Sequence, residues 1–363
     1  MSGMAEVLLE RRGALGLITL NRPQALNALT LEMIHAMTDR LADWAADPAV
    51  AGVLIRGAGD KAFSAGGDIR ALIRPDNADY IAGFFADEYR LNRLIFRYPK
   101  PYVALIDGIA MGGGVGVSVN GAFRIATGAT LFAMPETGIG MYPDVGGSYF
   151  LPRCPGETGM YLGLTGARLD VADCLYTGIA DVQIGAESHG AMIERLAAGD
   201  AAETVLRALA EPPGPAPLAE HREAIDRCFA GDSVEDIVAA LEGEGGDFAA
   251  RTLEALAAKS PFALKVAFRQ LRQGRALDFE ECMAMEYRLS QRVVPGHDFR
   301  EGVRAAVIDK DRSPRWHPAT LAAVSDDRVA ACFAPLPGGE LTFAAAPGGG
   351  ITPTQPSPIK GEG

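Results

Sequence analysis

The chain has 363 residues, of which 48% are apolar and 22% are charged, and its formal net charge is −12 at pH 7. This composition is typical of a folded globular protein with more than one domain. The negative charge and the lack of a run of Lys and Arg argue against a nucleic acid partner, because phosphate backbones bind clustered cations. No uninterrupted apolar stretch approaches the ~20 residues of a membrane span, so no membrane partner is expected.

The cysteines and histidines give no sign of a disulfide framework or a metal site. The five cysteines lie far apart without CxxC spacing, which is typical of reduced thiols in a cytosol-like compartment. The first residues resemble neither a secretory signal nor an Arg-rich presequence, so a cytoplasmic protein is predicted. The five histidines lack HxH or HExxH spacing, so neither a metal nor a cofactor is predicted.

The first 185 residues alternate β-rich runs with helical patterns. The predicted elements are a hairpin over 6–20, helices over 30–46, 77–98, 156–165 and 171–176, and strands over 52–56, 101–107 and 180–184. Strands that alternate with helices predict an α/β layered core.

The rest of the chain is predicted to be helical. No clear strand pattern follows residue 187, and helical patterns separated by Pro/Gly linkers continue to residue 309. From about residue 336 the chain is rich in Gly, Pro, Ser and Thr, which favours disorder. We therefore expect a core over residues 1–200, a helical region over 201–335 and a disordered tail over 336–363.

Two predicted strands each run into a glycine-rich turn before a helical pattern. One turn contains Gly66 and Gly67, and the other contains Gly112, Gly113 and Gly114. Glycines let a ligand approach the free N–H groups at a helix start, and such groups bind oxyanions and phosphates. We expect the N–H groups of Gly67 and Gly113 to converge on one carbonyl oxygen, as in an oxyanion hole. Taken singly, each turn is also explained as a tight connection between a strand and a helix.

Two carboxylates follow the second turn in segments rich in Pro and Gly. Glu136 ends Met-Pro-Glu within an otherwise apolar run, which is an unusual place for a surface charge. Asp144 follows Pro143, where it could instead favour a helix N-terminus electrostatically. A third acid, Glu88, lies in an amphipathic helical pattern, where a glutamate is ordinarily a solvated surface charge.

Three motifs together resemble the crotonase (enoyl-CoA hydratase/isomerase) superfamily over about residues 5–200. They are the segments at 62–69, 108–114 and 134–136. The resemblance implies an α/β fold with a core of ββα spiral turns, followed here by the C-terminal helical region. It also implies an acyl-CoA ligand whose thioester oxygen is held by the N–H groups of Gly67 and Gly113. Members are commonly trimers or hexamers, so a homo-oligomer is expected.

The reaction type follows from the acids that are present. Hydratases of the family use two glutamates, and the corresponding positions here are Gly116 and Glu136. Glycine cannot hold a proton of water, so addition of water to an enoyl-CoA is disfavoured. The segments at 84–92, 131–137, 142–153 and 298–316 resemble the hydrolases of the family instead.

The resemblance implies hydrolysis of 3-hydroxyisobutyryl-CoA in valine breakdown, with 3-hydroxypropionyl-CoA as a related substrate. The alternatives are an enoyl-CoA hydratase or isomerase of the same fold, and a non-catalytic acyl-CoA-binding subunit. The resemblance places Glu88, Gly113, Glu136 and Asp144 around the acyl group. Glu136 could attack the carbonyl or deprotonate water, and the sequence leaves both routes open.

Coenzyme A is expected to bind as part of the substrate. The resemblance puts the loops at 22–28 and 61–68 near the nucleotide, mainly through backbone groups. Lys265 on the later helix could reach a phosphate, although a solvated helix face explains it equally well. The predicted CoA contacts are Ala25, Ala65, Gly66, Gly67, Asp68 and Lys265.

Overall fold

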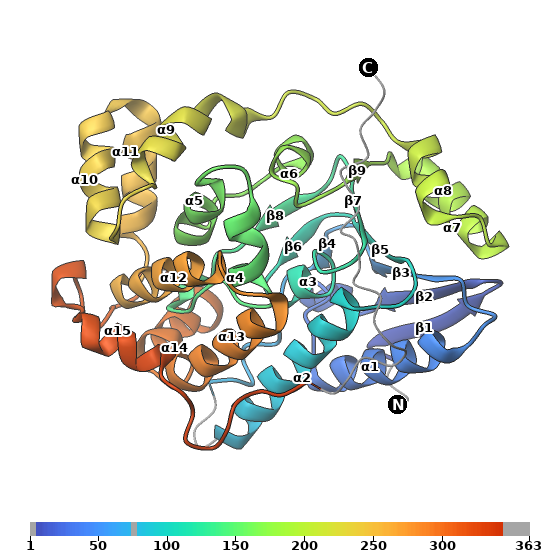
Figure 1. The fold of residues 1–363 in the computed structure, drawn as a ribbon, viewed down its shortest axis with the longest axis horizontal. Helices are drawn as coiled ribbons and strands as arrows, with labels where there is room; N and C mark the ends of the chain where they lie inside the picture. The colour runs from blue at the N-terminus through green and yellow to red at the C-terminus, as the bar shows by residue number, and fades with distance from the viewer. Residues whose placement is uncertain (1–4, 74–77, 344–363) are drawn as a thin grey trace.

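The protein is described here by a computed structural model that covers residues 5–73 and 78–343. The strands occupy the centre and one end of the molecule, and helices α9 to α15 gather at the other end (Figure 1). The strands are β1 (Val7–Arg12), β2 (Leu15–Leu20), β3 (Gly52–Gly57), β4 (Ala62–Ser64), β5 (Tyr102–Ile106), β6 (Ile109–Met111), β7 (Phe123–Ala126), β8 (Leu131–Ala133) and β9 (Val182–Gln183).

The helices are unevenly distributed along the chain, because most follow β9. They are α1 (Leu31–Ala46), α2 (Ala78–Phe96), α3 (Gly113–Gly116), α4 (Gly147–Phe150), α5 (Thr158–Thr165), α6 (Val171–Thr177), α7 (His189–Ala198), α8 (Ala202–Leu209), α9 (Arg222–Cys228), α10 (Val234–Glu244), α11 (Gly246–Ala257), α12 (Pro261–Gly274), α13 (Phe279–Val293), α14 (His297–Val303) and α15 (Asp326–Phe333).

Two sheets form the core. The larger sheet has the strand order β1-β2-β3-β5-β7-β9, in which only the predicted β1–β2 hairpin is antiparallel. The smaller sheet, β4-β6-β8, is entirely parallel. Successive strand pairs along the chain place one strand in each sheet, which is the ββα spiral that the resemblance implied. Because parallel strands end at the same edge, the turns after β4, β6 and β8 meet there.

The inner strands β2, β3 and β5 of the larger sheet are mostly buried, which explains their apolar sequence, whereas the edge strand β1 is largely exposed. Leu17 pairs with Leu54, and both belong to a smaller apolar cluster with Val205 of α8. The alternate residues of the same strands, such as Ile18 and Ile55, pack into the larger cluster with α1. Helices α7 and α8 therefore cover one face of the sheet and α1 covers the other.

The helix starts follow the predicted signals. Thr30 caps α1 by accepting a hydrogen bond from Met33 N at 3.3 Å, as its sequence predicted. The strands β4, β6, β7 and β8 were not predicted, because strands of three or four residues are too short to show a periodic pattern. Helix α15, with eight residues, was also missed.

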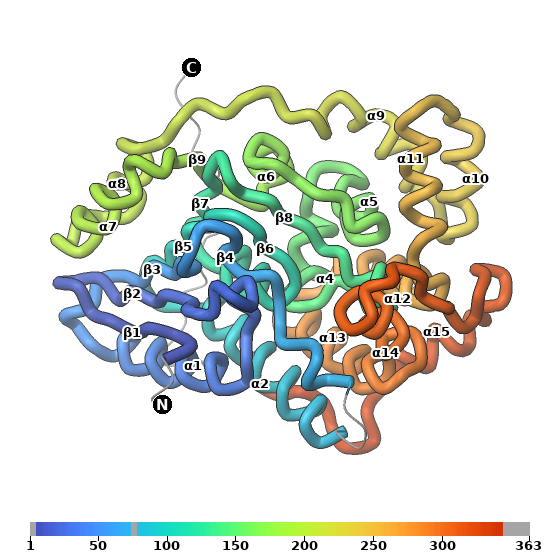
Figure 2. Tube along the Cα trace, turned by 180° about the vertical axis from the view of Figure 1, so that it is seen from behind, coloured from blue at the N-terminus to red at the C-terminus, as the bar shows by residue number. Residues whose placement is uncertain are grey.

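The helical half divides into two groups. A connection over residues 210–221, which ends in the 3-10 helix Pro217–His221, runs from α8, at one end of the sheet, to α9, at the opposite end of the molecule (Figure 2). No strand follows β9 within the described part of the chain. None of the helices within residues 5–73 and 78–343 is long and apolar enough to cross a bilayer.

The start of the predicted disordered tail contacts the helical region. Leu341 is buried, and Glu340 Oε2 accepts a hydrogen bond of 2.6 Å from Arg288 Nε of α13. The part of the predicted tail after residue 343 lies outside the described residues.

Candidate active site

The turns after β4, β6 and β8 surround a cavity of about 770 Å³. The turn after β4 contributes Gly67, the turn after β6 contributes Gly113, and Glu136 follows β8. Glu88 from α2 and Asp144 from the loop before α4 complete the wall. The structure thus brings together all the residues that the sequence placed around an acyl group.

The two glycine turns lie in contact. A Cβ atom built on Gly113 would be 3.2 Å from the amide nitrogen of Gly67 and 2.6 Å from Oε1 of Glu88. Within the described residues, neither the Gly67 N–H nor the Gly113 N–H donates a hydrogen bond. Leu29 fixes the first turn, because its N–H donates to Gly66 O and its carbonyl accepts from Asp68 N, both at 2.8 Å. Both N–H groups are therefore available to one oxygen atom.

Glu136 begins the short 3-10 helix Glu136–Ile139, directly after β8. Its side chain is 5% exposed, and Oε2 has no hydrogen-bond partner among the described residues. Burial, followed by repulsion from Asp144, raises its pKa well above the usual range, while Lys259 and the Gly112 N–H act in the opposite direction. A carboxylate with a raised pKa is a stronger base and nucleophile than a solvated one.

Asp144 is also 5% exposed. Burial raises its pKa to about 7, although a hydrogen bond from Tyr89 favours the ionised form. The Tyr89 hydroxyl donates to Asp144 Oδ2 at 3.0 Å, and Tyr89 is itself fully buried on α2. Asp144 can therefore change its charge near neutral pH while its orientation is fixed.

Glu88 is 3% exposed, so the interpretation of this residue as a solvated surface charge is wrong. It lies on the buried face of α2 beside Phe84 and Phe85, which also line the cavity. Burial, then repulsion from Asp144 and Glu286, raises its pKa well above the usual range. Its neutral form, which can donate a hydrogen bond, is therefore favoured more than in a solvated glutamate.

The position of the missing second glutamate is filled. A Cβ atom built on Gly116 would be 2.7 Å from Asn92 Nδ2 and 2.7 Å from Val145 Cβ. Asn92 is fully buried, and neither polar atom of its side chain has a partner among the described residues. The structure leaves no room at residue 116 for a second acid.

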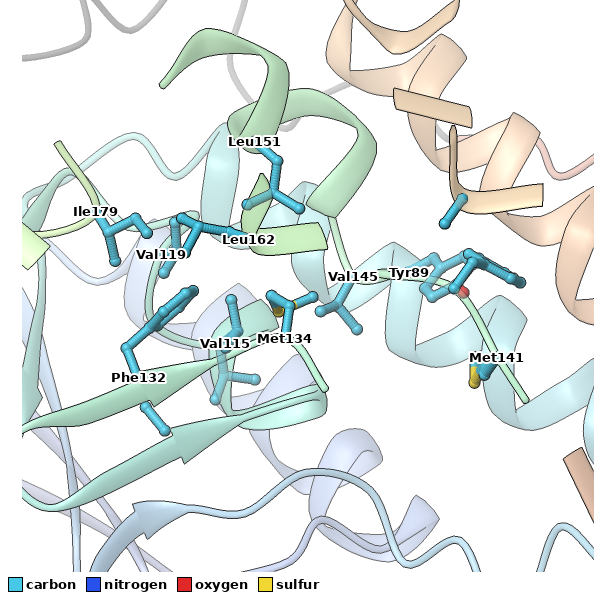
Figure 3. Close-up of a cluster of buried hydrophobic side chains, with 14 of the residues drawn as sticks. Tyr89, Val115, Val119, Phe132, Met134, Met141, Val145, Leu151, Leu162 and Ile179 are labelled. Carbon is cyan, nitrogen blue, oxygen red and sulfur yellow. The ribbon is translucent and has the colours of Figure 1, made fainter. Parts of the chain in front are cut away.

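Buried apolar side chains pack around the segments that carry the glycine turns and the two acids Glu136 and Asp144. Val115 of α3, Phe132 of β8, Met134 and Val145 are all buried and belong to one cluster (Figure 3). Close packing of this kind limits the movement of the attached backbone. The polar groups of the site therefore rest on a rigid apolar support.

Part of the predicted CoA site lies at the cavity. Ala65, Gly66 and Gly67 line it, whereas Asp68 pairs with Arg22 Nη2 at 3.3 Å. Ala25 lies in the 3-10 helix Pro23–Ala25, and the loop that follows it accepts a hydrogen bond from Ala65 N at Leu26 O. The two predicted nucleotide loops are thus neighbours.

Lys265 does not line this cavity. Its Nζ lies 2.6 Å from Glu235 Oε1 and donates to Val324 O at 3.2 Å. Lys265 and Glu235 line a separate pocket of about 510 Å³, which Arg269 also lines. The structure therefore does not bring Lys265 together with the other predicted CoA contacts.

Three cationic residues that the sequence analysis missed do line the cavity: Arg168, Lys259 and Arg312. None of them forms an ion pair with an acid of the described residues. Lys259 Nζ lies 3.5 Å from where a Cβ atom would stand if one were built on Gly138, and also 3.5 Å from a Cβ built on Gly166. The position of Lys259 just before the Ser-Pro start of α12 was a weak sequence signal for a cation at the site. No sequence pattern marked Arg168 or Arg312.

No metal site accompanies these groups. Across residues 5–73 and 78–343, no group of three or more His, Cys, Asp or Glu side chains could hold a metal ion. All five cysteines are free and buried.

Comparison with known proteins identifies close relatives of the chain. A family model described as enoyl-CoA hydratase/isomerase matches residues 15–333. The mitochondrial 3-hydroxyisobutyryl-CoA hydrolase of Danio rerio is 49% identical over 344 residues, which are 92% of this chain and 90% of the relative. The enzyme of the same name from Bos taurus is 47% identical over 351 residues, with 93% and 91% covered. The crystal structure of a carnitinyl-CoA dehydratase from Mycobacterium thermoresistibile has a TM-score of 0.88 and 44% identity, and the match covers 93% of this chain and 98% of that one.

These relatives contradict the predicted cytoplasmic location, because they are named as mitochondrial enzymes. The prediction rested partly on five widely spaced thiols. Free thiols show only that a chain does not use disulfides, and they do not distinguish one reducing compartment from another.

Proposed function

Because this chain belongs to the enoyl-CoA hydratase/isomerase family, we propose that its cavity binds an acyl-CoA thioester and hydrolyses it to a free acid and coenzyme A. The chain is an acyl-CoA thioester hydrolase, and its substrate is 3-hydroxyisobutyryl-CoA. The observation that carries this proposal is that Glu136 and Asp144 face the same cavity as the free N–H groups of Gly67 and Gly113.

The two N–H groups bind the thioester oxygen. In the tetrahedral transition state this oxygen becomes negatively charged, and the two fixed dipoles stabilise that charge more than they stabilise the neutral carbonyl. Glu88 lies beside Gly113, and in its neutral form it adds a third hydrogen bond to this oxygen or to the 3-hydroxyl group. This arrangement favours attack at the carbonyl carbon.

Glu136 starts the reaction by one of two routes. As a nucleophile it forms an anhydride with the acyl group, the C–S bond breaks, and water then hydrolyses the anhydride. As a general base it takes a proton from water, the resulting hydroxide attacks the carbonyl carbon, and the proton passes to the departing thiolate. Asp144, as a carboxylate, orients the 3-hydroxyl group or the attacking water.

Oxygen labelling separates the two routes. A single turnover in water enriched in ¹⁸O, followed by mass spectrometry of the peptide that contains Glu136, detects label only if the side chain was acylated. Label in this peptide would establish an anhydride that water opens at the Glu136 carbonyl, and its absence would remove this form of the covalent route.

Hydrolysis is favoured over addition of water to a double bond. Such an addition uses two glutamates in this family, and the position of one of them holds Gly116 here. Asn92 and Val145 fill the space around Gly116, so no acid can replace the missing one there. The related structure named as a carnitinyl-CoA dehydratase makes a hydratase-like reaction the competing proposal.

The cations at the cavity support a polyanionic substrate. The chain carries a net charge of −12, yet Arg168, Lys259 and Arg312 line the cavity without pairing with a described acid. We propose that they attract the phosphates of coenzyme A, which binds as part of the substrate, and that no separate cofactor takes part.

Three finer statements belong to the same proposal. The reaction serves valine breakdown, 3-hydroxypropionyl-CoA is a second substrate, and the protein is a homo-oligomer, either a trimer or a hexamer. The last two are open to direct measurement by activity on that ester and by light scattering of the purified protein.

The release of free thiol from 3-hydroxyisobutyryl-CoA tests the function. Wild-type protein is expected to release thiol, and Glu136→Gln is expected to lower the rate at least about 100-fold. Glu281→Gln, at an exposed residue of α13, is the matched control and should keep the wild-type rate. Consumption of crotonyl-CoA or a 3-enoyl-CoA without thiol release would favour a hydratase or isomerase. Turnover unchanged by Glu136→Gln would favour a non-catalytic binder.

A further inference from the structure

A fourth buried carboxylate lies behind the site, on a helix of the C-terminal half. Glu286 of α13 is fully buried and does not line the cavity. Its oxygens accept three hydrogen bonds from the loop that carries Asp144: Gly146 N at 2.9 Å, Ser148 N at 3.0 Å and Ser148 Oγ at 2.5 Å. These three hydrogen bonds join one side chain of α13 to residues 146–148.

The loop needs this support, because its backbone is strained. Val145 has φ of +51°, a left-handed conformation that is unfavourable for a β-branched residue. Such a conformation persists only where surrounding contacts determine it. Asn120 holds Val145 from one side by donating to its carbonyl at 3.0 Å, and Glu286 binds the next N–H group, that of Gly146.

The contacts continue from this loop to α13 and α2. The Tyr142 hydroxyl donates to the backbone carbonyl of Glu286 at 2.7 Å, so α13 holds the loop on both sides of Asp144. Tyr89 of α2 then holds the Asp144 carboxylate itself. Asp144 is therefore fixed by two helices, one of which belongs to the C-terminal half.

We propose that Glu286 is a positioning residue of the thioesterase reaction, which fixes the Asp144–Ser148 loop so that the Asp144 carboxylate faces the acyl group. The inference rests on the proposed function. Glu286 does not touch the substrate, and its effect passes through Asp144. Burial raises the pKa of Glu286 to about 8. Both carboxyl oxygens keep a lone pair in the ionised and in the neutral form, so each can accept these hydrogen bonds in either form.

The substitution Glu286→Gln tests this role. Glutamine keeps the shape but turns one acceptor into a donor, so Gly146 N–H or the Ser148 groups lose their partner. We expect kcat for 3-hydroxyisobutyryl-CoA to fall about tenfold to a hundredfold, with KM within about threefold, because a small displacement of a reacting group has effects of this size. The control Glu280→Gln, on the same helix, loses contacts with Arg93 and Arg97 but none with the loop, and should keep wild-type kcat.

A double-mutant cycle distinguishes positioning from general destabilisation. If Glu286 acts through Asp144, adding Glu286→Gln to Asp144→Asn lowers kcat no further. Effects of the two substitutions that multiply would overturn the proposal. If Glu286→Gln does not fold, Ser148→Ala, which removes one of the three donors, takes its place in the cycle with the same expected non-additivity.

Hydrogen exchange gives a readout that does not depend on activity. In Glu286→Gln the N–H groups of Gly146 and Ser148 should exchange about tenfold faster or more, while Glu280→Gln leaves them unchanged. Unchanged exchange at both residues in Glu286→Gln would overturn the proposed role of Glu286, whichever ester the wild-type protein hydrolyses. If the wild-type protein released no thiol while Glu286→Gln showed the faster exchange, the proposed function would be refuted. The role of Glu286 in fixing the Asp144–Ser148 loop would still stand.

Discussion

The hydroxyl group of Tyr89 donates a hydrogen bond of 3.0 Å to Oδ2 of Asp144, and both residues are buried. This bond stabilises the ionised carboxylate and opposes the burial that raises the pKa of Asp144 to about 7. Tyr89→Phe should therefore raise this pKa further. If activity needs ionised Asp144, the acidic limb of the pH profile of kcat should move about one pH unit upward.

The matched control is Tyr98→Phe, which removes a hydrogen bond to Leu41 O, and neither residue lines the cavity. Its pH profile should coincide with that of the wild type. A Tyr89→Phe profile that moved toward lower pH, or did not move, would show that Asp144 does not act as a carboxylate.

The oxyanion site can be tested at Gly113, where a methyl group would be 2.6 Å from Glu88 Oε1 and 3.2 Å from Gly67 N. Gly113→Ala thus places carbon where the thioester oxygen should bind. We expect kcat/KM to fall about 10² to 10³-fold, the usual effect of losing an oxyanion contact. Gly83→Ala on α2, where a Cβ meets no atom of residues 5–73 or 78–343 within 4 Å, is the control. Equal activity of the two variants would place the oxyanion elsewhere.

The sequence was sufficient to predict the local parts of the site. Glu136, Asp144 and the glycine turns each lie in a short motif, and β4, β6 and β8 bring these motifs together even though the strands themselves were too short to predict. The contacts made across the chain were missed, because no local pattern encodes them. Glu286 binds Gly146 from 140 residues away. Lys259 reaches the cavity only because α12 begins beside the turn that follows Glu136.

The packing at Gly116 gives a prediction about stability. A Cβ atom there would lie 2.7 Å from both Asn92 Nδ2 and Val145 Cβ, closer than side chains can approach. Gly116→Ala should lower the free energy of unfolding by about 1–3 kcal/mol, as overpacked cores do. Adding Asn92→Ala should recover part of this loss, because one of the two clashes is removed. Urea denaturation of the two single variants and the double variant measures both effects, and losses that simply add would contradict the contact.

Lys259 and Lys265 offer a paired test of where coenzyme A binds. Lys259 lines the cavity and forms no ion pair with any acid in the described part of the chain, whereas Lys265 is paired with Glu235 in a separate pocket. Lys259→Gln should raise KM for 3-hydroxyisobutyryl-CoA about tenfold, because it removes a partly buried cation that attracts the phosphates of coenzyme A. It should also raise the pKa of Glu136, on which Lys259 acts in the lowering direction. Lys265→Gln should leave KM within about twofold, and the reverse result would return the phosphate site to α12 as the sequence first indicated.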